Sequence, residues 1–493
     1  RPPLAPGFDR GVPFVMKDGV DLYGGFAGTE SSLGQRDVAA HSTIISGDVR
    51  DNDATFGNTD NAINLIQMAG GTNTLDGLTL RDAYGGYAVE QSGGTLTLRN
   101  CTLENNHAGG GFGKTVGSTT IQNCLLQQND SYAIASSSPG LGTYGTATTV
   151  ESCLIQSNSL AGGVAVSLID TNVTVADCEF TSNLGTALIA EPLQNNNLGT
   201  NGTVQVSGCR FVDNSEGLEL QGYAPFRVSN CEFRGNHATI NQWSGGITDF
   251  TKALGGISNE IANCSFVGNS SAFQGPSGGA LSLDVGGFKA TAVINCSFLG
   301  NQKLGGYGGA GAVWVGTSFP GRTNRIINCV MWNNEVDGST NVNNASLGLG
   351  FSPPQVIIGN SLIQNLNPAG VGNLDGTNPA NDPLFVDAGD PTLAPSTNGN
   401  PHLPDGSHRL TATRWRLRRH AFSRKTRDQF NNLRRHLPHL PPHWCYNART
   451  KSQVSVLPTP SASPSPVVTS GVSRSRPTVE LPALLLLLAT YGE

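Results

Sequence analysis

The sequence predicts an all-β chain, a right-handed parallel β-helix (a solenoid) with a disordered C-terminal tail. Three observations lead to this prediction: a short phrase recurs nine times, Gly is abundant while Met is scarce, and the composition changes abruptly near Ser407. The 493 residues include 63 Gly and only 3 Met, which favours turns and strands because Gly weakens helices. Self-similarity on this scale is typical of stacked repeats.

The recurring phrase has the form [VIL]-x-N-C-x-[FL]-x-x-N and is anchored on nine of the ten Cys residues. An Asn stands five residues after every one of these nine Cys, and a large apolar residue stands two residues after each. The Cys positions are Cys101, Cys124, Cys153, Cys178, Cys209, Cys231, Cys264, Cys296 and Cys329. The Asn positions are Asn106, Asn129, Asn158, Asn183, Asn214, Asn236, Asn269, Asn301 and Asn334.

Successive Cys residues are 22 to 33 residues apart, so we expect coils that share one core and differ in loop length. Stacking places equivalent residues of neighbouring coils about 4.7 to 4.9 Å apart, with the apolar positions forming an inward ladder. Asn suits the bends because it tolerates the left-handed region and carries both donors and acceptors. Short apolar runs after Gly, such as "GGVAVSL" at 162–168 and "GAVWVG" at 311–316, supply further strands. The right hand follows from the usual handedness of parallel crossovers.

These observations divide the chain into three parts. Residues 1–365 are expected to form the β-helix, residues 366–407 a closing segment or cap, and residues 408–493 a basic and then Pro/Ser-rich tail. Because the chain begins at Arg1 rather than Met, we expect N-terminal coils to be missing.

The repeated Cys is interpreted as a small buried apolar residue. A disulfide requires converging Cβ vectors, whereas side chains in a parallel stack run side by side. Zinc requires four ligands around one point, and a ladder spreads its members along an axis. The repeated Asn is likewise interpreted as structural.

The repeat also resembles a known family. Five coils contain literal F-x-x-N ("FTSN", "FVDN", "FRGN", "FVGN" and "FLGN"), and "GGAL" stands at 278–281. This combination resembles the paired F-x-x-N and G-G-A-[ILV] repeats of polymorphic outer membrane proteins of the chlamydial type. The segments "GVDLYGGFAGTESSLGQRD" (19–37) and "NDPLFVDAGD" (381–390) are similar to the opening and closing parts of large secreted bacterial right-handed β-helix proteins. The resemblance implies a protein that is secreted or held at the bacterial cell surface or outer membrane, and it covers roughly residues 12–407.

A search for catalytic residues gives no complete set. Glycoside hydrolysis needs two carboxylates held across the scissile bond. The sequence offers one "NTD" at 58–60 but no D-D, G-H-G or R-x-K partner of the polygalacturonase pattern. The best acidic cluster is Asp48, Asp51 and Asp53, which is either a solvated loop or a Ca²⁺ site that stabilises this loop. No catalytic residue and no other cofactor are predicted.

Histidine and exposed aromatic residues are further candidates for ligand contacts. His107 and His237 lie five coils apart, about 24 Å along the axis, so they cannot share a metal or a substrate. Exposed aromatic residues often line sugar-binding grooves, and Tyr307 and Trp332 are the predicted ligand contacts. Trp243 is a further possibility, while Trp314 is expected to pack within an apolar strand.

The tail after Ser407 differs from the rest of the chain. It holds 14 of the 30 Lys and Arg but only 3 of the 36 Asp and Glu. Because Gly, acidic residues and the repeat are lost together, we hypothesise a frameshift near Ser407, which translation of the other two reading frames would test. A basic arm for nucleic acid and a metal site at His436, His439, His443 and Cys445 are alternatives that no supporting core favours. The apolar run "LPALLLLLA" at 481–489 is too short to span a bilayer.

The leading functional hypothesis is a non-enzymatic scaffold for adhesion, binding carbohydrate or another partner through its long polar flank. The expected partner is an extracellular polysaccharide or protein surface, with no nucleic acid, no transmembrane segment and a monomeric state. The alternative is a polysaccharide lyase or glycoside hydrolase of the pectate-lyase-like fold. An enzyme should place at least two acids and a base together on one face of adjacent coils, whereas a scaffold should scatter them.

Overall fold

The computed structural model describes part of the chain, and every described residue lies in one compact unit, Arg1–Pro438. The described residues are 9–53, 57–136, 146–159, 163–192, 202–251, 259–283, 290–306, 308–316, 323–340, 345–350 and 355–400. The predicted tail, residues 408–493, lies outside them. Within the described part, no helix is long and apolar enough to cross a membrane.

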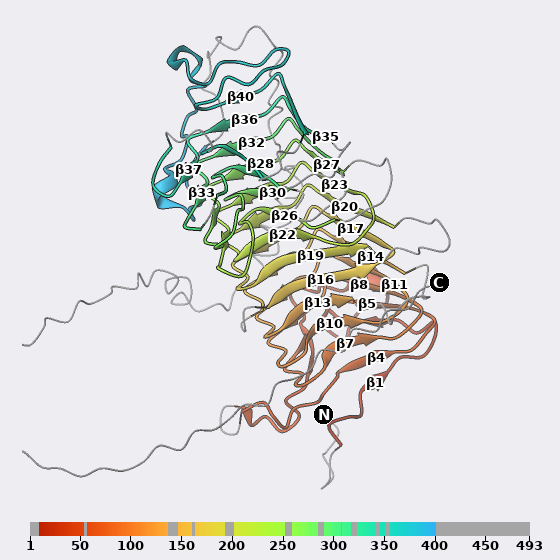
Figure 1. Ribbon diagram of the computed structural model, residues 1–493. Coiled ribbons are helices and arrows are strands. Elements are labelled where there is room, and N and C mark those ends of the chain that lie inside the picture. Colours follow the sequence, from red (N-terminus) through yellow and green to blue (C-terminus); the bar gives the residue numbers. More distant parts are fainter. Residues whose placement is uncertain are drawn as a thin grey trace, which may run out of the picture. The chain divides into compact units, whose positions relative to one another are not determined.

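The described residues form three parallel sheets of 12 strands each (Figure 1). We name them sheets A, B and C after their first strands, β1, β2 and β3. Each sheet takes one strand from each coil in turn, and all the paired strands in the three sheets run parallel, as they do between β10 and β13. This arrangement confirms the predicted all-β parallel β-helix. A fourth sheet of four short strands, sheet D, follows sheet C in the later coils.

The strands of sheet A are β1 (Phe14–Val15), β4 (Ile66–Met68), β7 (Tyr87–Gln91), β10 (Gly110–Lys114), β13 (Tyr132–Ser136), β16 (Val164–Asp170), β19 (Thr186–Pro192), β22 (Glu216–Leu220), β26 (Ile247–Asp249), β30 (Leu281–Leu283), β34 (Val313–Val315) and β38 (Leu347–Leu349). The strands of sheet B are β2 (Leu22–Tyr23), β5 (Thr72–Asp76), β8 (Thr95–Arg99), β11 (Ser118–Gln122), β14 (Ala147–Glu151), β17 (Asn172–Ala176), β20 (Thr203–Ser207), β23 (Phe226–Ser229), β27 (Asn259–Ala262), β31 (Thr291–Ile294), β35 (Thr323–Ile327) and β39 (Gln355–Gly359).

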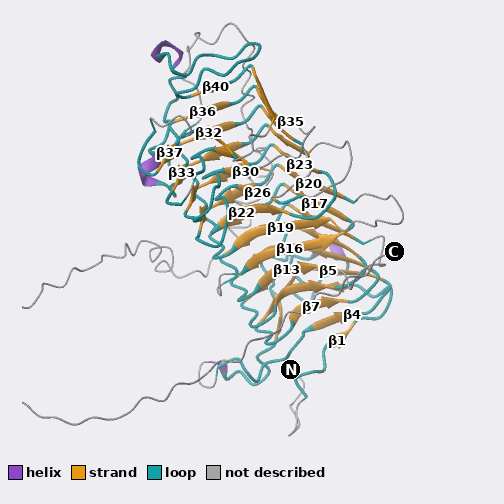
Figure 2. Ribbon diagram, viewed as in Figure 1, coloured by secondary structure: helices purple, strands orange, loops and turns teal. Residues whose placement is uncertain are grey.

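The strands of sheet C are β3 (Thr43–Ser46), β6 (Leu78–Arg81), β9 (Thr102–Glu104), β12 (Leu125–Gln127), β15 (Leu154–Gln156), β18 (Glu179–Thr181), β21 (Arg210–Val212), β24 (Glu232–Arg234), β28 (Ser265–Val267), β32 (Ser297–Leu299), β36 (Val330–Trp332) and β40 (Leu362–Ile363). Sheet D contains β25 (His237–Ala238), β29 (Ser270–Ser271), β33 (Gln302–Lys303) and β37 (Glu335–Val336). The helices described are short 3₁₀ turns, η1 (Leu33–Gln35), η2 (Pro379–Asn381) and η3 (Pro391–Leu393) (Figure 2).

The repeated phrase spans the turn from sheet B to sheet C and the turn that follows sheet C. In "VINCSFLGN", Val293 lies in β31, Cys296 follows the first turn and Phe298 lies in β32, all buried. The left-handed residues at the two turns are Asn295 (φ 54°) and Gly300 (φ 58°). The second turn therefore differs from the expectation, because its left-handed residue precedes the ladder Asn. The nine Cys of the phrase are buried and free.

The ladder Asn side chains form a continuous chain of hydrogen bonds inside the solenoid. Asn236 is fully buried, and its Nδ2 donates to the Phe211 carbonyl and to Asn269 Oδ1, each at 2.9 Å. Its Oδ1 accepts from both the backbone N–H and Nδ2 of Asn214 at 3.0 Å. The same link joins each ladder Asn to the next from Asn106 to Asn334. Each amide thus pairs backbone groups that the turn would otherwise leave buried without a partner.

Beside this ladder, five Phe rings stack along the axis. Neighbouring centroids lie 4.6 to 4.9 Å apart and the rings are within 7° of parallel. This spacing matches the distance between hydrogen-bonded strands. The rings are Phe180, Phe211, Phe233, Phe266 and Phe298.

An ion pair is buried inside the solenoid between sheets A and B. Lys114 Nζ lies 2.8 Å from Asp170 Oδ1, and the two side chains are 1% and 2% exposed. Thr148 accepts from Lys114 Nζ at 2.7 Å and donates to Asp170 Oδ2 at 2.6 Å, while Ser136 also donates to Asp170 Oδ2. Burial lowers the pKa of Lys114, and the Asp170 charge opposes that effect. Both charges are thus paired and hydrogen-bonded, as burial requires.

The closing segment returns along the turns that follow sheet C. The backbone N–H of Ser396 donates to the Gly268 carbonyl at 2.9 Å. Arg234 Nη1 donates to the carbonyls of Thr397 and Gly399 at 2.8 and 2.9 Å. The closing segment therefore packs against several earlier coils.

Glycine marks where this segment docks. Nine residues with positive φ precede the nine ladder Asn, and six of them are not Gly: Asn105, Gln128, Ser157, Ser182, Asp213 and Asn333. The other three are Gly235, Gly268 and Gly300. A Cβ on Gly268 would lie 2.1 Å from the Ser396 carbonyl oxygen, and one on Gly235 would lie 3.1 Å from the Ser396 carbonyl carbon. Close approach of the closing segment, rather than φ alone, requires Gly here.

We expect Gly268→Asn to displace the closing segment and to destabilise the protein by about 1 to 3 kcal/mol, because overpacking forces the backbone apart. Limited proteolysis with mass spectrometry and thermal denaturation measure both effects. Ser182→Asn is the matched control, since Ser182 has the same left-handed backbone, φ 55°. It should change stability by less than about 0.5 kcal/mol. Equal effects of the two variants would contradict this account of the glycine positions.

Candidate functional site

The outer face of sheet A brings acidic side chains of neighbouring coils together. Glu219 stands between Leu218 and Leu220, which belong to the core, so strand alternation points Glu219 outward. Glu191 follows the core residue Ala190 in the neighbouring strand β19 and also points outward. Both are partly buried, and their charges interact.

Glu216 lies at the start of β22 on the same face. A Cβ on the next residue, Gly217, would meet the core ring of Phe233, so Glu216 faces the other way. It is 1% exposed, and its carboxylate accepts from Thr248 Oγ1 at 2.6 Å and from Thr186 Oγ1 at 3.0 Å. Burial first, and then the Glu219 charge, raise the pKa of Glu216 to about 8. Burial also raises the pKa of Glu219.

The raised pKa predicts a pH-dependent contribution to stability. Between pH 4.5 and about 8, folded Glu216 keeps its proton while the unfolded chain releases it. The free energy of unfolding therefore falls as pH rises through this range, by at most about 5 kcal/mol. We expect Glu216→Gln to remove this part of the pH dependence, measured by denaturant unfolding from pH 5 to pH 9. Glu260→Gln, at a partly exposed glutamate paired with Arg227 on sheet B, is the control and should leave the slope unchanged. A constant difference between wild type and Glu216→Gln across this range would contradict the raised pKa.

An aromatic patch, defined as Trp243, Phe250, Phe273 and Trp314, lies next to these acids. The Trp243 ring stacks on Phe273 at 4.4 Å, meets Phe250 edge-on at 5.7 Å and lies 6.3 Å from Trp314. Trp314 points outward from β34 because both of its neighbours are core residues, and it is 6% exposed. The other three are partly exposed.

The segment between β25 and β26 joins the acids to the aromatic patch. Ser271 Oγ donates to the Trp243 carbonyl at 2.8 Å, which fixes this segment to sheet D. Gln242 Nε2 donates at 3.2 Å to Thr186 Oγ1, the same hydroxyl that donates to Glu216. The backbone at Trp243 and the side chain of its neighbour Gln242 are thus both held by polar contacts, and the second contact is to the hydroxyl that binds Glu216.

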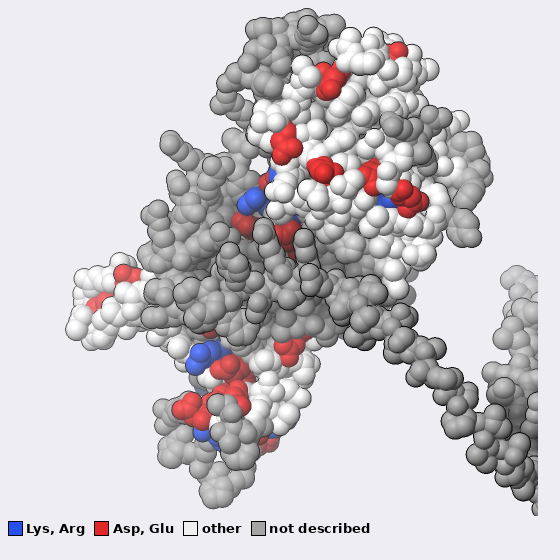
Figure 3. Space-filling model, turned by 90° about the vertical axis from the view of Figure 1, so that its left-hand side faces the viewer, with Lys and Arg blue, Asp and Glu red and all other residues white. Residues whose placement is uncertain are grey.

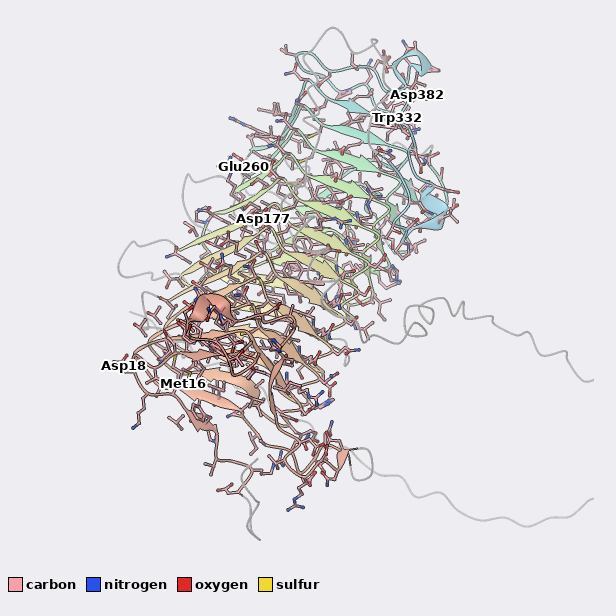
Figure 4. The ribbon with its side chains drawn as sticks, turned by 180° about the vertical axis from the view of Figure 1, so that it is seen from behind. Met16, Asp18, Asp177, Glu260, Trp332 and Asp382 are labelled. Carbon is pink, nitrogen blue, oxygen red and sulfur yellow. The ribbon has the colours of Figure 1, made fainter. Side chains whose placement is uncertain are left out.

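Trp243, the further possibility from the sequence, belongs to the aromatic patch, whereas Trp332 lies on another sheet. Tyr307 is outside the described residues. Trp332 lies in β36 on sheet C, in register with Leu299, and is partly exposed (Figure 4). His107 Nδ1 contacts Asp130 at 2.8 Å and His237 Nδ1 contacts Ser270 at 2.7 Å. Ligand binding by Tyr307 and Trp332 stays a prediction.

The acidic loop is held by its own hydrogen bonds. Asp48 Oδ1 accepts from the backbone N–H of Asn52 at 3.1 Å, and Asp53 Oδ2 accepts from Asn61 Nδ2 at 3.0 Å. Asp51 has a positive φ of 59°. Across the described ranges, no group of three or more His, Cys, Asp or Glu is placed to hold a metal ion. Calcium at Asp48, Asp51 and Asp53 stays a prediction.

Sequence reasoning missed the three glutamates of sheet A. The signal for Glu191 and Glu219 is that "LIAEP" and "GLELQ" place Glu at outward positions of otherwise apolar strands. Glu216 has no such signal, because alternation with Leu218 and Leu220 would point it inward. The proximity of the two strands depends on register, which pairs Ile189 with Glu219.

Comparison with protein families gives one match, to a model described as a right-handed β-helix region. It matches residues 48–201 and 94–253, which together make up less than half of the chain. Searches of curated proteins and of solved structures found no match. With the three parallel sheets, the family match confirms the predicted right-handed β-helix.

Proposed function

We propose that this protein is a non-enzymatic β-helix scaffold, secreted or displayed at a bacterial cell surface, that binds carbohydrate through the aromatic patch. The observation that carries the proposal is the stacking of Trp243 on Phe273 at the outer face of sheet A, 4.4 Å between ring centroids. Aromatic faces present a flat apolar surface, which suits the C–H face of a sugar ring. The F-x-x-N and G-G-A repeats, similar to those of polymorphic outer membrane proteins, support the extracellular placement.

The setting of the patch supports binding to a long chain. Sheet A continues on both sides of the patch, because β26, β30 and β34 are flanked by β22 and β38 in the strand order. A polysaccharide lying along the outer face would meet equivalent positions about every 4.8 Å. Trp314 lies in β34, and the Trp243 carbonyl is held by Ser271 Oγ, so little ordering of these two residues is needed when a ligand binds.

A glycoside hydrolase is the second candidate, because Glu216 and Glu219 lie in one strand and the pKa of Glu216 is raised. A general acid must reach the glycosidic oxygen, however, and Glu216 is 1% exposed with hydroxyl donors already bound to its carboxylate. The three acids converge without a basic residue in ion-pair contact among the described residues. Binding without cleavage therefore agrees better with this geometry.

The test compares two Trp variants on a panel of immobilised glycans. Trp243→Ala is expected to weaken binding of any retained glycan by about tenfold or more, because the stacking surface is lost. Trp332→Ala tests the contact on sheet C that the sequence predicts, and a site confined to the aromatic patch would leave the binding of this variant unchanged. Loss of binding in Trp332→Ala with retention in Trp243→Ala would place the site on sheet C and refute the proposal.

A further inference from the structure

We propose that the aromatic patch selects glycans without negative charge and rejects polyuronates. This inference rests on the proposed function, since it concerns which carbohydrate the patch accepts. Two observations support this inference: acidic side chains border the patch, and nearby basic side chains are already bound to carbonyl or carboxylate oxygens.

The acidic border of the patch has no counter-charge in the described part of the chain. Glu219 lies in β22, beside β26, and Phe250 of the patch directly follows β26. Glu219 accepts from Gln221, a neutral donor, and the Glu191 charge lies close enough to raise the Glu219 pKa. A uronate chain on sheet A would bring further carboxylates against these two without a cation between them, and like charges at short range repel.

A described basic side chain that contacts the backbone of the aromatic patch is turned away from any ligand. Lys303 is fully buried, and its Nζ donates to the backbone carbonyls of Phe273 at 2.7 Å, Leu304 at 3.0 Å and Gly305 at 2.5 Å. Three carbonyl oxygens satisfy the three N–H donors of the ammonium group. Lys303 therefore supports the backbone beneath Phe273 and offers no donor to a carboxylate outside.

Several other basic groups of the described coils are engaged in ion pairs. Arg210 and Arg234 pair with Glu232 at 3.0 and 2.7 Å, and Arg227 pairs with Glu260 at 3.1 Å. Lys114 faces the interior toward Asp170. Residues 1–407 hold 33 of the 36 acidic residues but 16 of the 30 basic ones. Asp and Glu also predominate on the face drawn in Figure 3. The charges of the described residues around the patch thus disfavour a polyanion.

The experiment titrates the full-length protein with three hexasaccharides, cellohexaose, N-acetylated chitohexaose and hexagalacturonate, in EDTA to remove bridging divalent cations. At 10 to 20 mM salt we expect at least one uncharged hexasaccharide to bind tenfold or more tightly than hexagalacturonate. Raising the salt to about 0.5 M should shrink this ratio, because screening shortens the range of repulsion. Glu191→Gln with Glu219→Gln should raise hexagalacturonate affinity and leave the uncharged ligand within about twofold, while Glu260→Gln changes neither.

Equal or tighter binding of hexagalacturonate, or a ratio that the double variant leaves unchanged, would overturn the inference but not the proposed function. Failure of the proposed function gives a different pattern, in which none of the three oligosaccharides binds or Trp243→Ala binds as the wild type does. Thermal denaturation of each variant confirms that the comparison is made between folded proteins.

Discussion

Replacing Asn236 by Ala is expected to lower the free energy of unfolding by about 4 kcal/mol, a large effect for a change that removes no charge. The Asn236 amide makes hydrogen bonds to the Phe211 carbonyl, to Asn269 Oδ1 and to two N–H groups of Asn214. Ala would leave the Phe211 carbonyl and two N–H groups of Asn214 without these bonds, whereas Asn269 Oδ1 would still accept from the backbone N–H of residue 236. Each buried group left unpaired costs about 1 to 3 kcal/mol unless water enters. Urea denaturation measures the change.

Asn230→Gly is the matched control in the same coil. Asn230 has a left-handed backbone, φ 56°, and an exposed side chain, so Gly keeps the conformation and loses little. We expect a change below about 1 kcal/mol. If both variants are equally stable, the ladder is a consequence of the turn geometry and does not stabilise it.

The second large effect is expected from Lys114→Met, which leaves Asp170 buried without its cation. We expect the free energy of unfolding to fall by about 3 to 5 kcal/mol, since breaking a buried ion pair leaves a charge without its partner in surroundings of low polarity. The remaining hydroxyl donors, Ser136 and Thr148, stabilise the carboxylate only in part. Denaturation at pH 7 measures this loss.

The double variant Lys114→Met with Asp170→Leu distinguishes the contribution of the ion pair to stability from that of the surrounding hydrogen bonds. It should recover much of the lost stability, because replacing both charges by apolar groups removes the desolvation penalty. If the double variant is as unstable as Lys114→Met alone, the loss of stability comes from the hydroxyl network and not from the loss of charge pairing.

The repeat was predictable from the sequence because each coil must supply the same groups at the same two turns. Val293, Cys296, Phe298 and Asn301 are all buried, and the spacing of the phrase alone gives their arrangement. One further coil contains a weaker form of the repeated phrase. In "NSLIQN", Ser361 takes the place of Cys, donates to the Gly359 carbonyl and accepts from the Cys329 N–H. Its hydroxyl replaces the thiol of the earlier coils.

The closing segment and the candidate site were not predictable in the same way. The change from Ser182 and Asp213 to Gly235 and Gly268 is visible in the sequence, but what approaches those glycines depends on a segment more than 120 residues later. The acidic and aromatic side chains of sheet A likewise come from different coils. Their proximity depends on loop lengths that vary from coil to coil, so no local pattern identifies them.

The most direct test of the central claim is titration of the wild-type protein with a panel of neutral and uronic oligosaccharides, scored at once for binding by calorimetry and for cleavage by release of reducing or unsaturated ends. The account predicts saturable binding of a neutral oligosaccharide with no new ends formed. Cleavage of any member of the panel, above all cleavage that depends on Ca²⁺, would contradict a non-enzymatic scaffold.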